Sequence, residues 1–428
     1  MKIVTMGLGY IGLPTAVMFA NHNQDVVGVD VNCLTVEQLN RGILHIEEPG
    51  LQEELNHALA CGTFKASLTP EKADVFIIAV PTPNHNDDLK SCDLSYVANA
   101  IKSILPFVEV GNTIILESTV APQSTENLVQ PMLEEAGFII GETIYLVHCP
   151  ERVLPGQIIH ELVYNNRIIG GVTAECTQAG KEVYETFVKG ELILTTARTA
   201  ELSKLMENTF RDVNIALANE LVKISADLDI DALKVIEMAN KHPRVNLHQP
   251  GPGVGGHCLA IDPYFIAAAS PDYSPLIQLS REINTSMPQF VITKTNQLMQ
   301  QYSGKKITVF GLTYKGDIDD VRESPAMEIY EHLTAQQCFE VVAYDPHVEA
   351  AFVEKNLAVA INNADLILVL TDHSAFREMD STTFENMNQK NILDTKNILN
   401  VSANDINYIN LGNLARIEKV IEQTTQLA

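Results

Sequence analysis

The chain has few of the features that mark secreted, membrane-spanning or nucleic-acid-binding proteins. Its 7 cysteines are an odd number and contain no Cys-x-x-Cys pair, which argues against a disulfide framework or a zinc ribbon and for a reducing cytosol. With 29 Lys and Arg against 54 Asp and Glu, its net charge of −25 would repel nucleic acid and anionic membranes. No apolar run approaches the ~20 residues of a membrane span. Gly7, Gly9, Gly12 and Pro14 interrupt the apolar N-terminus, which argues against a signal peptide. We therefore expect a cytoplasmic protein that neither inserts into a membrane nor binds nucleic acid.

The 428 residues alternate short β-branched runs with longer helical patterns. This alternation is typical of a doubly wound α/β fold with a parallel sheet. The runs that read as buried strands in the first half are KIVTMG, DVVGVD, ADVFIIAV, NTIILEST and IYLVHCP.

The middle of the chain reads as helix and the last third repeats the first pattern. Residues 199–228 contain neither Pro nor Gly and have a helical period, which predicts one long central helix. After Ser303, similar strand-like runs return, which predicts a second Rossmann-like domain. The fold class is thus α/β, with two Rossmann-like doubly wound domains joined by a helical domain. The expected boundaries are 1–196 for the first Rossmann-like domain, 197–302 for the helical domain, which carries a cysteine loop, and 303–428 for the second Rossmann-like domain.

The N-terminus predicts a dinucleotide site. Gly7, Gly9 and Gly12 form the spacing Gly-x-Gly-x-x-Gly between a strand and a helix pattern, where a pyrophosphate can meet the backbone and the helix N-terminus. Asp30 ends the next strand, at the place of the carboxylate that accepts the ribose hydroxyls. Because that carboxylate would repel a 2′-phosphate, NAD is favoured over NADP. The repeat in the last third carries Thr313 where Gly9 would be, so we expect it to hold a different ligand.

A second unusual stretch is the glycine-rich loop GPGVGGHC at 251–258. Such a loop brings backbone N–H groups close to a ligand and leaves Cys258 reachable, although a plain turn with an inert cysteine has about even odds. Lys204, Asn208 and Arg211 share one face of the central helix, where an ammonium and an amide suit an oxyanion.

Polar residues also follow two of the predicted strands, at the sheet edge where functional groups gather. Glu117, Ser118 and Thr119 end one strand, and Glu151 and Arg152 follow the next. A glutamate there is a candidate general base, with a cap or a surface charge as the alternative. His257 is next to Cys258 but is expected to point away from it, as a loop or substrate contact.

With these residues in place, the chain resembles the UDP-glucose/GDP-mannose dehydrogenase family over essentially its whole length. The motifs that carry the resemblance are GLGYIGLPTA, VPTP, ESTVAP, CPERVLPG, ELSKLMENTFRDVNIALANEL, GPGVGGHC and GLTYKGDIDDVRESP. It is most similar to the branch that oxidises UDP-N-acetyl-D-mannosamine to the uronate for surface polysaccharide. Ala260, where enzymes acting on UDP-N-acetylglucosamine tend to carry proline, favours that branch.

The resemblance implies a four-electron oxidation at C6 of the sugar, with NAD as acceptor. It implies that Cys258 is the nucleophile, forming a thiohemiacetal and then a thioester. Lys204 and Asn208 would stabilise oxyanions, and Glu151 would act as acid and base in thioester hydrolysis. Thr119 and Asp262 would hold the water and its hydrogen-bond network.

The resemblance also implies the binding residues. The cofactor would contact Gly7, Gly9, Tyr10, Ile11, Gly12, Asp30, Pro81, Thr82 and Thr119. The UDP-sugar would contact Arg152, Val153, Leu154, Lys204, Asn208, Arg211, Arg244, His248, Gly255, Lys315 and Arg322. The last domain would bind UDP, no metal is implied, and a homodimer would form through the central helix, with Arg244 able to reach the neighbouring subunit's substrate.

The loop that carries Cys92 leaves a strand end on the cofactor side. We hypothesise that Cys92 can form an inactivating disulfide with Cys258, which a mass map of peroxide-treated protein would test.

Three alternatives stay open at this point. UDP-N-acetylglucosamine or UDP-glucose could be the substrate. A two-electron 3-hydroxyacid-type dehydrogenase would share the first fold but need no cysteine and no second α/β domain. An NAD-sensing protein without catalysis would have no use for Lys204, Asn208 and Cys258 together.

Overall fold

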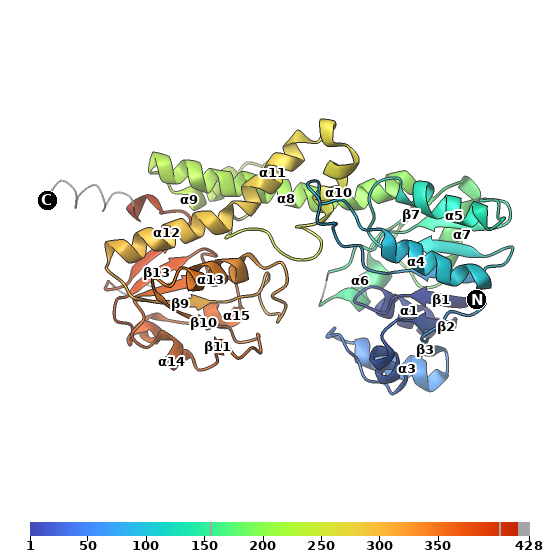
Figure 1. The fold of residues 1–428 in the computed structure, drawn as a ribbon, viewed down its shortest axis with the longest axis horizontal. Coiled ribbons are helices and arrows are strands. Elements are labelled where there is room, and N and C mark those ends of the chain that lie inside the picture. The colour runs from blue at the N-terminus through green and yellow to red at the C-terminus, as the bar shows by residue number, and fades with distance from the viewer. Residues whose placement is uncertain (155, 402–403, 418–428) are drawn as a thin grey trace. The chain divides into compact units, whose positions relative to one another are not determined.

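The computed structural model describes residues 1–154, 156–401 and 404–417 (Figure 1). The chain divides into two compact units. Unit 1 consists of residues 1–207 and 264–273, and unit 2 consists of residues 208–263 and the residues from 274 onward.

Unit 1 is built on an eight-stranded sheet. Its strands, in spatial order, are β3 (Phe64–Ser67), β2 (Asp25–Val29), β1 (Lys2–Met6), β4 (Val75–Ile78), β5 (Thr113–Leu116), β6 (Tyr145–His148), β7 (Arg167–Gly171) and β8 (Leu192–Thr196). Its helices up to the central one are α1 (Gly12–Asn21), α2 (Cys33–Asn40), α3 (Leu51–Cys61), α4 (Ser95–Ile104), α5 (Gln130–Glu135), α6 (Ile158–Tyr164) and α7 (Ala174–Tyr184), with a 3-10 turn at Leu105–Phe107 and a π-turn at Thr125–Val129. The order of β3 to β6 is that of a doubly wound dinucleotide-binding sheet, as the sequence predicts.

The strand expectations are confirmed, and the sheet of unit 1 contains three further strands, β3, β7 and β8. The five runs named from the sequence form β1, β2, β4, β5 and β6, and these pair in parallel. β7 was not expected, and it runs antiparallel to β6. Its sequence, RIIGG, is short and opens on a charge, so its apolar pattern alone is weak. Antiparallel pairing here places Arg167 beside the carboxyl ends of β5 and β6.

The long central helix predicted at 199–228 is α8 (Ala197–Leu228), with 32 residues. The helices that follow are α9 (Ala232–Ala239), α10 (Asp262–Ala269), α11 (Pro275–Thr285) and α12 (Met287–Gln301), with a 3-10 turn at Pro271–Tyr273.

Unit 2 contains the second Rossmann-like sheet. Its strands, in spatial order, are β11 (Val353–Glu354), β10 (Glu340–Tyr344), β9 (Lys306–Phe310), β12 (Leu366–Val369), β13 (Asn391–Asp394) and β14 (Asn407–Asn410), all parallel. The remaining helices are α13 (Pro325–Ala335), α14 (Leu357–Ile361) and α15 (Ser374–Arg377), with a 3-10 turn at Ser381–Phe384. The internal repeat read from the sequence is therefore a repeat of structure.

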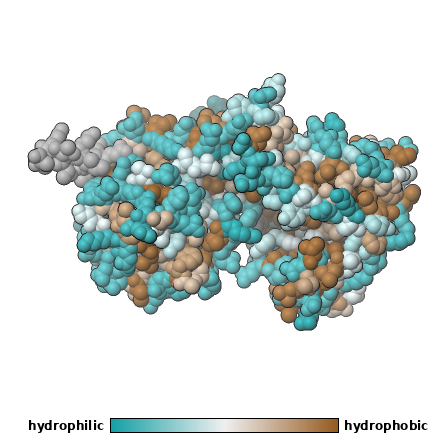
Figure 2. Space-filling model, in the orientation of Figure 1, coloured by the Kyte–Doolittle hydropathy of each residue, from teal (hydrophilic) through white to brown (hydrophobic). Residues whose placement is uncertain are grey.

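Much of the visible surface is hydrophilic. Figure 2 shows hydrophilic residues spread over the visible face of both units, with hydrophobic residues in small groups among them. Among the described residues, no helix has the length and apolar character needed to cross a membrane.

The core of unit 1 encloses one titratable group that makes folding sensitive to acid. His148, at the end of β6, is fully buried, and burial lowers its pKa to about 3, against a smaller opposing effect of the Leu116 backbone. The unfolded chain binds this proton near pH 6.5, and the folded chain does not. His148 therefore contributes stability that is complete above pH 6.5 and is lost as the pH falls toward 3.

We predict that His148→Leu flattens the acid side of the stability profile. Between pH 7.5 and 5.5 the wild type should lose about 1 kcal/mol more unfolding free energy than the variant, since one pKa unit corresponds to about 1.4 kcal/mol. Denaturant unfolding at both pH values measures this. His45→Leu, at an exposed histidine, is the control. Equal acid losses in wild type and His148→Leu would contradict the assignment.

Candidate active site

In the glycine turn between β1 and α1, two of the three glycines are required by the fold and the third is not. Gly7 has φ +91°, and a Cβ there would lie 2.5 Å from the Ala79 carbonyl oxygen. A Cβ on Gly12 would lie 1.9 Å from the carbonyl oxygen of Gly7. Both glycines are thus required by packing. A Cβ on Gly9 would meet no atom within 4 Å, so the fold itself does not require glycine there. Glycine at this position instead suits a ligand that approaches the backbone closely.

The other predicted cofactor residues surround this turn. Asp30 accepts hydrogen bonds from the N–H groups of Leu8, at 3.0 Å, and Asn32, at 2.9 Å, which fixes its carboxylate beside the glycine turn. Ile11 precedes α1 and makes no side-chain cap, and the positive end of the α1 dipole lies at this turn, which suits an anion. Tyr10 is exposed. These groups fit the pyrophosphate and ribose of NAD.

The loops that follow β4 and β5 are joined. The Thr82 hydroxyl donates to the Thr119 carbonyl oxygen at 2.6 Å, and the Ser118 hydroxyl donates to the Val80 carbonyl oxygen at 2.8 Å. Pro81 lies between the two bonded residues of the first loop. The structure therefore brings together the ends of neighbouring parallel strands, where the sequence analysis placed Pro81, Thr82 and Thr119.

Beneath these loops lies a buried charge network that the sequence analysis missed in part. Arg167 pairs with Glu151 and, at 3.1 Å, with Glu117, and all three are nearly inaccessible to solvent. The Tyr184 hydroxyl donates to Glu117 at 2.5 Å. Burial raises the pKa of Glu117 to about 7, against Arg167, which lowers it. Burial likewise raises the pKa of the Cys149 thiol to about 12, so this cysteine is not a nucleophile.

Glu151 was expected to act as an acid and base, and the structure shows how it is held. One oxygen pairs with Arg167, and the other accepts the Arg152 N–H at 2.6 Å. The one feature of the sequence that could have indicated the role of Arg167 is a charged residue in a short apolar strand. Arg152 itself binds Glu207 through two bonds, at 3.1 Å and 2.6 Å, and Val153 and the exposed Leu154 follow it.

In unit 2, the structure brings Asn208 and Asp262 together. The Asn208 amide donates to the Asp262 carboxylate at 2.6 Å, and both side chains are buried. The Asp262 N–H donates to the Cys258 carbonyl oxygen at 2.8 Å, so the exposed Cys258 lies one turn before the start of α10. Lys204, in unit 1, precedes Asn208 by one turn of α8.

The cysteine loop packs on the loop after β9. A Cβ on Gly255 would lie 2.3 Å from the Glu323 carbonyl oxygen, and one on Gly256 would lie 2.8 Å from the Tyr314 ring. Close packing therefore requires these glycines. His257 lies 3.0 Å from Asp320, as the loop contact that the sequence analysis allowed for it.

The remaining substrate candidates are distributed over unit 2. Arg322 binds Asp320 through two bonds, at 2.9 Å and 2.8 Å, and lowers the pKa of that carboxyl. The ring of His248 packs edge-on against Phe210, and burial, together with Arg211, lowers its pKa. Lys315 and Arg244 are exposed. The role of each in binding remains a prediction.

In the second Rossmann-like sheet, protein side chains fill the place that corresponds to the dinucleotide site. Asp345 follows β10 as Asp30 follows β2, but it is fully buried and bonded to His373 at 3.1 Å. Thr313, at the place of Gly9, is 1% exposed and donates to the Lys315 carbonyl oxygen. This agrees with the expectation that this half does not hold a pyrophosphate in the same way.

Asp317, His347 and His373 bring three ligand-type atoms within 4.8 Å of one another. Nδ1 of His373 already accepts the Asp317 N–H at 2.9 Å, and its Nε2 faces Asp345. The cluster is therefore a hydrogen-bond network that holds the loop after β9.

Three family models match consecutive parts of the chain. They describe the NAD binding domain (residues 1–188), the central domain (198–286) and the UDP binding domain (308–401) of the UDP-glucose/GDP-mannose dehydrogenase family. The chain belongs to this family. It is an NAD-dependent UDP-sugar dehydrogenase.

Individual relatives are similar over nearly the full length. The UDP-N-acetyl-D-mannosamine dehydrogenase of Methanocaldococcus jannaschii is 47% identical over 405 residues, covering 93% of each chain. An NDP-N-acetyl-D-galactosaminuronic acid dehydrogenase of Ralstonia solanacearum is 43% identical, over 92% of this chain and 95% of that one. The solved UDP-N-acetyl-mannosamine dehydrogenase of Staphylococcus aureus has a TM-score of 0.91 and 59% identity, and the match covers 98% of this chain and 100% of that one.

The geometry of the glycine turn leads to a direct test of the cofactor site. We predict that Gly9→Ala folds normally, because its Cβ meets no protein atom. It should bind NAD about tenfold more weakly or worse, since the methyl group occupies the path of the pyrophosphate. Calorimetric titration with NAD and thermal unfolding measure the two effects. Gly12→Ala is the contrasting variant and should unfold at a lower temperature. Unchanged NAD affinity in Gly9→Ala would contradict this assignment.

Proposed function

We propose that the enzyme oxidises the C6 hydroxyl of UDP-N-acetyl-D-mannosamine to UDP-N-acetyl-D-mannosaminuronate, for surface polysaccharide synthesis. The observation that carries the proposal is the high identity to dehydrogenases named for this substrate, with both nucleotide domains and the cysteine loop present. UDP-N-acetylglucosamine and UDP-glucose are the alternative substrates. When bound, NAD supplies the acceptor for each hydride.

Cys258 retains the intermediate in this proposal. Once the alcohol has lost a hydride and a proton, the thiolate adds to the aldehyde carbon, and the resulting thiohemiacetal can lose a second hydride to give a thioester. Water then cleaves the carbon–sulfur bond, the acid leaves, and the thiol is restored. The exposure of Cys258 suits this role, whereas the buried thiol of Cys149 does not.

The residues around the cysteine are proposed to stabilise negative charge and to position water. Asp262 accepts one N–H of the Asn208 amide, and the other N–H is the proposed donor for an oxyanion, together with the ammonium of Lys204. Glu151 and Thr119, in unit 1, are the proposed groups for water and proton transfer. Arg167 holds the Glu151 carboxylate in place through a buried ion pair, which suits a group that has to meet a water molecule in a fixed position.

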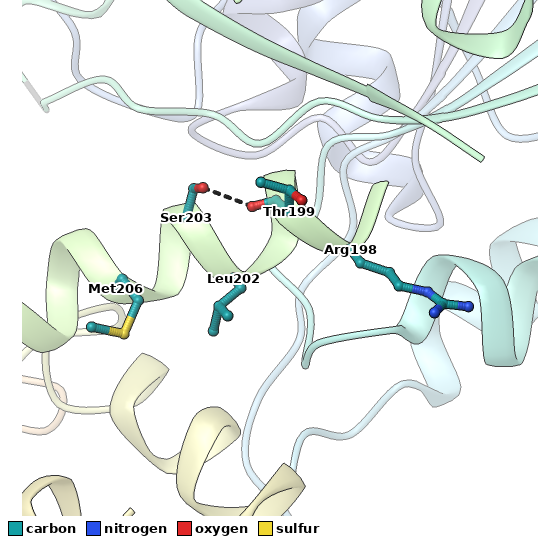
Figure 3. Close-up of a pocket in the computed structure, with 5 residues that line it drawn as sticks. All are labelled: Arg198, Thr199, Leu202, Ser203 and Met206. Carbon is teal, nitrogen blue, oxygen red and sulfur yellow. Dashed lines mark hydrogen bonds between the residues drawn. The ribbon is translucent and has the colours of Figure 1, made fainter. Parts of the chain in front are cut away.

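Dimerisation through α8 is also proposed. Leu202, Met206, Phe210, Leu217 and Ile224 are 41%, 44%, 57%, 51% and 48% exposed at helical spacings along α8, an apolar stripe that a second copy would cover. Leu202 and Met206 help to line a pocket of about 400 Å³ near the start of this helix. Figure 3 shows their side chains on one side of α8, with Arg198 directed away from them.

We predict that Cys258→Ser abolishes acid formation, because an alkoxide replaces the thiolate only at great cost at neutral pH. Purified enzyme with NAD and each UDP-sugar is the assay, scored as NADH formed per acid. The wild type should give two NADH per acid, fastest with UDP-N-acetyl-D-mannosamine, since each hydride reduces one NAD. Cys338→Ser, at another exposed cysteine, is the control and should keep full activity. One NADH with an aldehyde product would refute the four-electron route.

We predict that Leu217→Asp converts the enzyme from dimer to monomer, because burying a carboxylate in the apolar stripe is unfavourable. Sedimentation equilibrium should show the mass reduced by half. Leu276→Asp, at an exposed leucine of α11, should leave the mass unchanged. A wild type that sediments as a monomer would remove the dimer proposal.

A further inference from the structure

A carboxylate that the catalytic scheme does not use holds the segment after β6. Glu48 lies between α2 and α3 and is only 7% exposed. One of its oxygens accepts the Gly156 N–H at 2.7 Å, and the other accepts the Ile158 N–H at 2.8 Å. These partners lie 108 and 110 residues further along the chain. The bonds are therefore a tertiary link within unit 1.

Both N–H groups lie at the N-terminal end of α6. Ile158 opens α6, and Gln157 before it makes no side-chain cap. Gly156 has φ +94°, a conformation that directs the chain into α6 and favours glycine. Because the buried Ile158 N–H needs a partner, Glu48 supplies from a distance the cap that Gln157 does not make, and it also binds the N–H of the exposed Gly156.

Other carboxylates hold the same segment at its earlier residues. The Leu154 N–H donates to Glu161 at 2.7 Å, and the Arg152 guanidinium binds Glu207. The segment begins at Glu151, which is fixed by Arg167. Glu48 thus completes a set of anchors that holds both ends of the stretch from 151 to 158.

The position of this stretch gives the anchors a functional meaning. It leaves the carboxyl end of β6, and doubly wound sheets bind their ligands beyond such ends. The helix that precedes Glu48, α2, begins three residues after Asp30 of the cofactor site. Glu48 therefore ties the stretch that follows β6 to a segment on the cofactor side of unit 1.

We propose that Glu48 is a positioning residue for the UDP-sugar. It touches no reacting group and acts by holding residues 156–158, and through them the end of the segment that begins at Glu151, in the conformation that binds substrate. Its loss should raise the KM for the sugar nucleotide, with kcat and the KM for NAD unchanged, because binding then has to order the stretch. This inference rests on the proposed function in that it assigns the stretch after β6 to the sugar nucleotide.

The test compares Glu48→Gln with Glu47→Gln, its exposed neighbour. In Glu48→Gln the amide group no longer accepts one of the two N–H bonds, so the KM for UDP-N-acetyl-D-mannosamine should rise about tenfold. Hydrogen exchange should accelerate at residues 156 and 158 in the absence of substrate. Glu47→Gln should match the wild type in both measurements. If Glu48→Gln does not fold, Glu48→Asp keeps the charge but shortens the reach, and the same increase in KM is expected.

Two results would overturn the proposal. One is a lower melting temperature with an unchanged KM for the sugar nucleotide, which would make Glu48 purely structural. The other is a loss in kcat as large as the expected rise in KM, with the KM for the sugar nucleotide unchanged. The kinetics are run with whichever UDP-sugar the wild type turns over. A wrong substrate assignment therefore shows in the wild type alone, whereas a wrong role for Glu48 shows only in the comparison of variants.

Discussion

The buried pairing of Arg167 with Glu117 and Glu151 joins the parts of unit 1 that have to meet at the active site. One guanidinium connects the carboxyl ends of β5 and β6 with the start of the antiparallel strand β7. Removing a single partner would leave a buried charge without compensation, at a cost of about 3–5 kcal/mol. Because Glu151 is part of this network, the position of the proposed acid and base depends on Arg167.

The same sheet architecture occurs twice, with opposite outcomes at the glycine turn. In unit 1, Gly9 is free of steric contacts and Asp30 remains partly open. In unit 2, Asp345 is buried under His373, and Thr313 fills the place of the second glycine. The two Rossmann-like folds therefore differ in which side chains fill the space at the ends of corresponding strands. This explains how one architecture serves a dinucleotide in one half and a different nucleotide in the other.

The loops that carry the proposed catalytic residues are held in place by polar contacts and glycine packing rather than by regular secondary structure. The cysteine loop is held by glycine packing and by the pair of His257 with Asp320, and Asn208 is held by Asp262. The stretch after β6 is held by Glu48 and its companions. Loops fixed in this way can present groups to a substrate without much ordering on binding. That property suits the proposed mechanism, in which NADH is exchanged for NAD while a covalent intermediate is retained.

The sequence by itself determined the doubly wound class, the long central helix, the open glycine turn with Asp30 and the closed turn with Thr313. Each of these depends on local period or on spacing within one βα unit, which residues near in sequence specify. Only the tertiary structure revealed β7, the role of Arg167 and the link from Glu48 to Gly156 and Ile158. These depend on pairings between residues far apart in the chain, and neither periodicity nor motif spacing records which distant carboxylate meets which donor. The burial that shifts the pKa of Glu117 and His148 has the same origin, because a side chain's environment is set by packing.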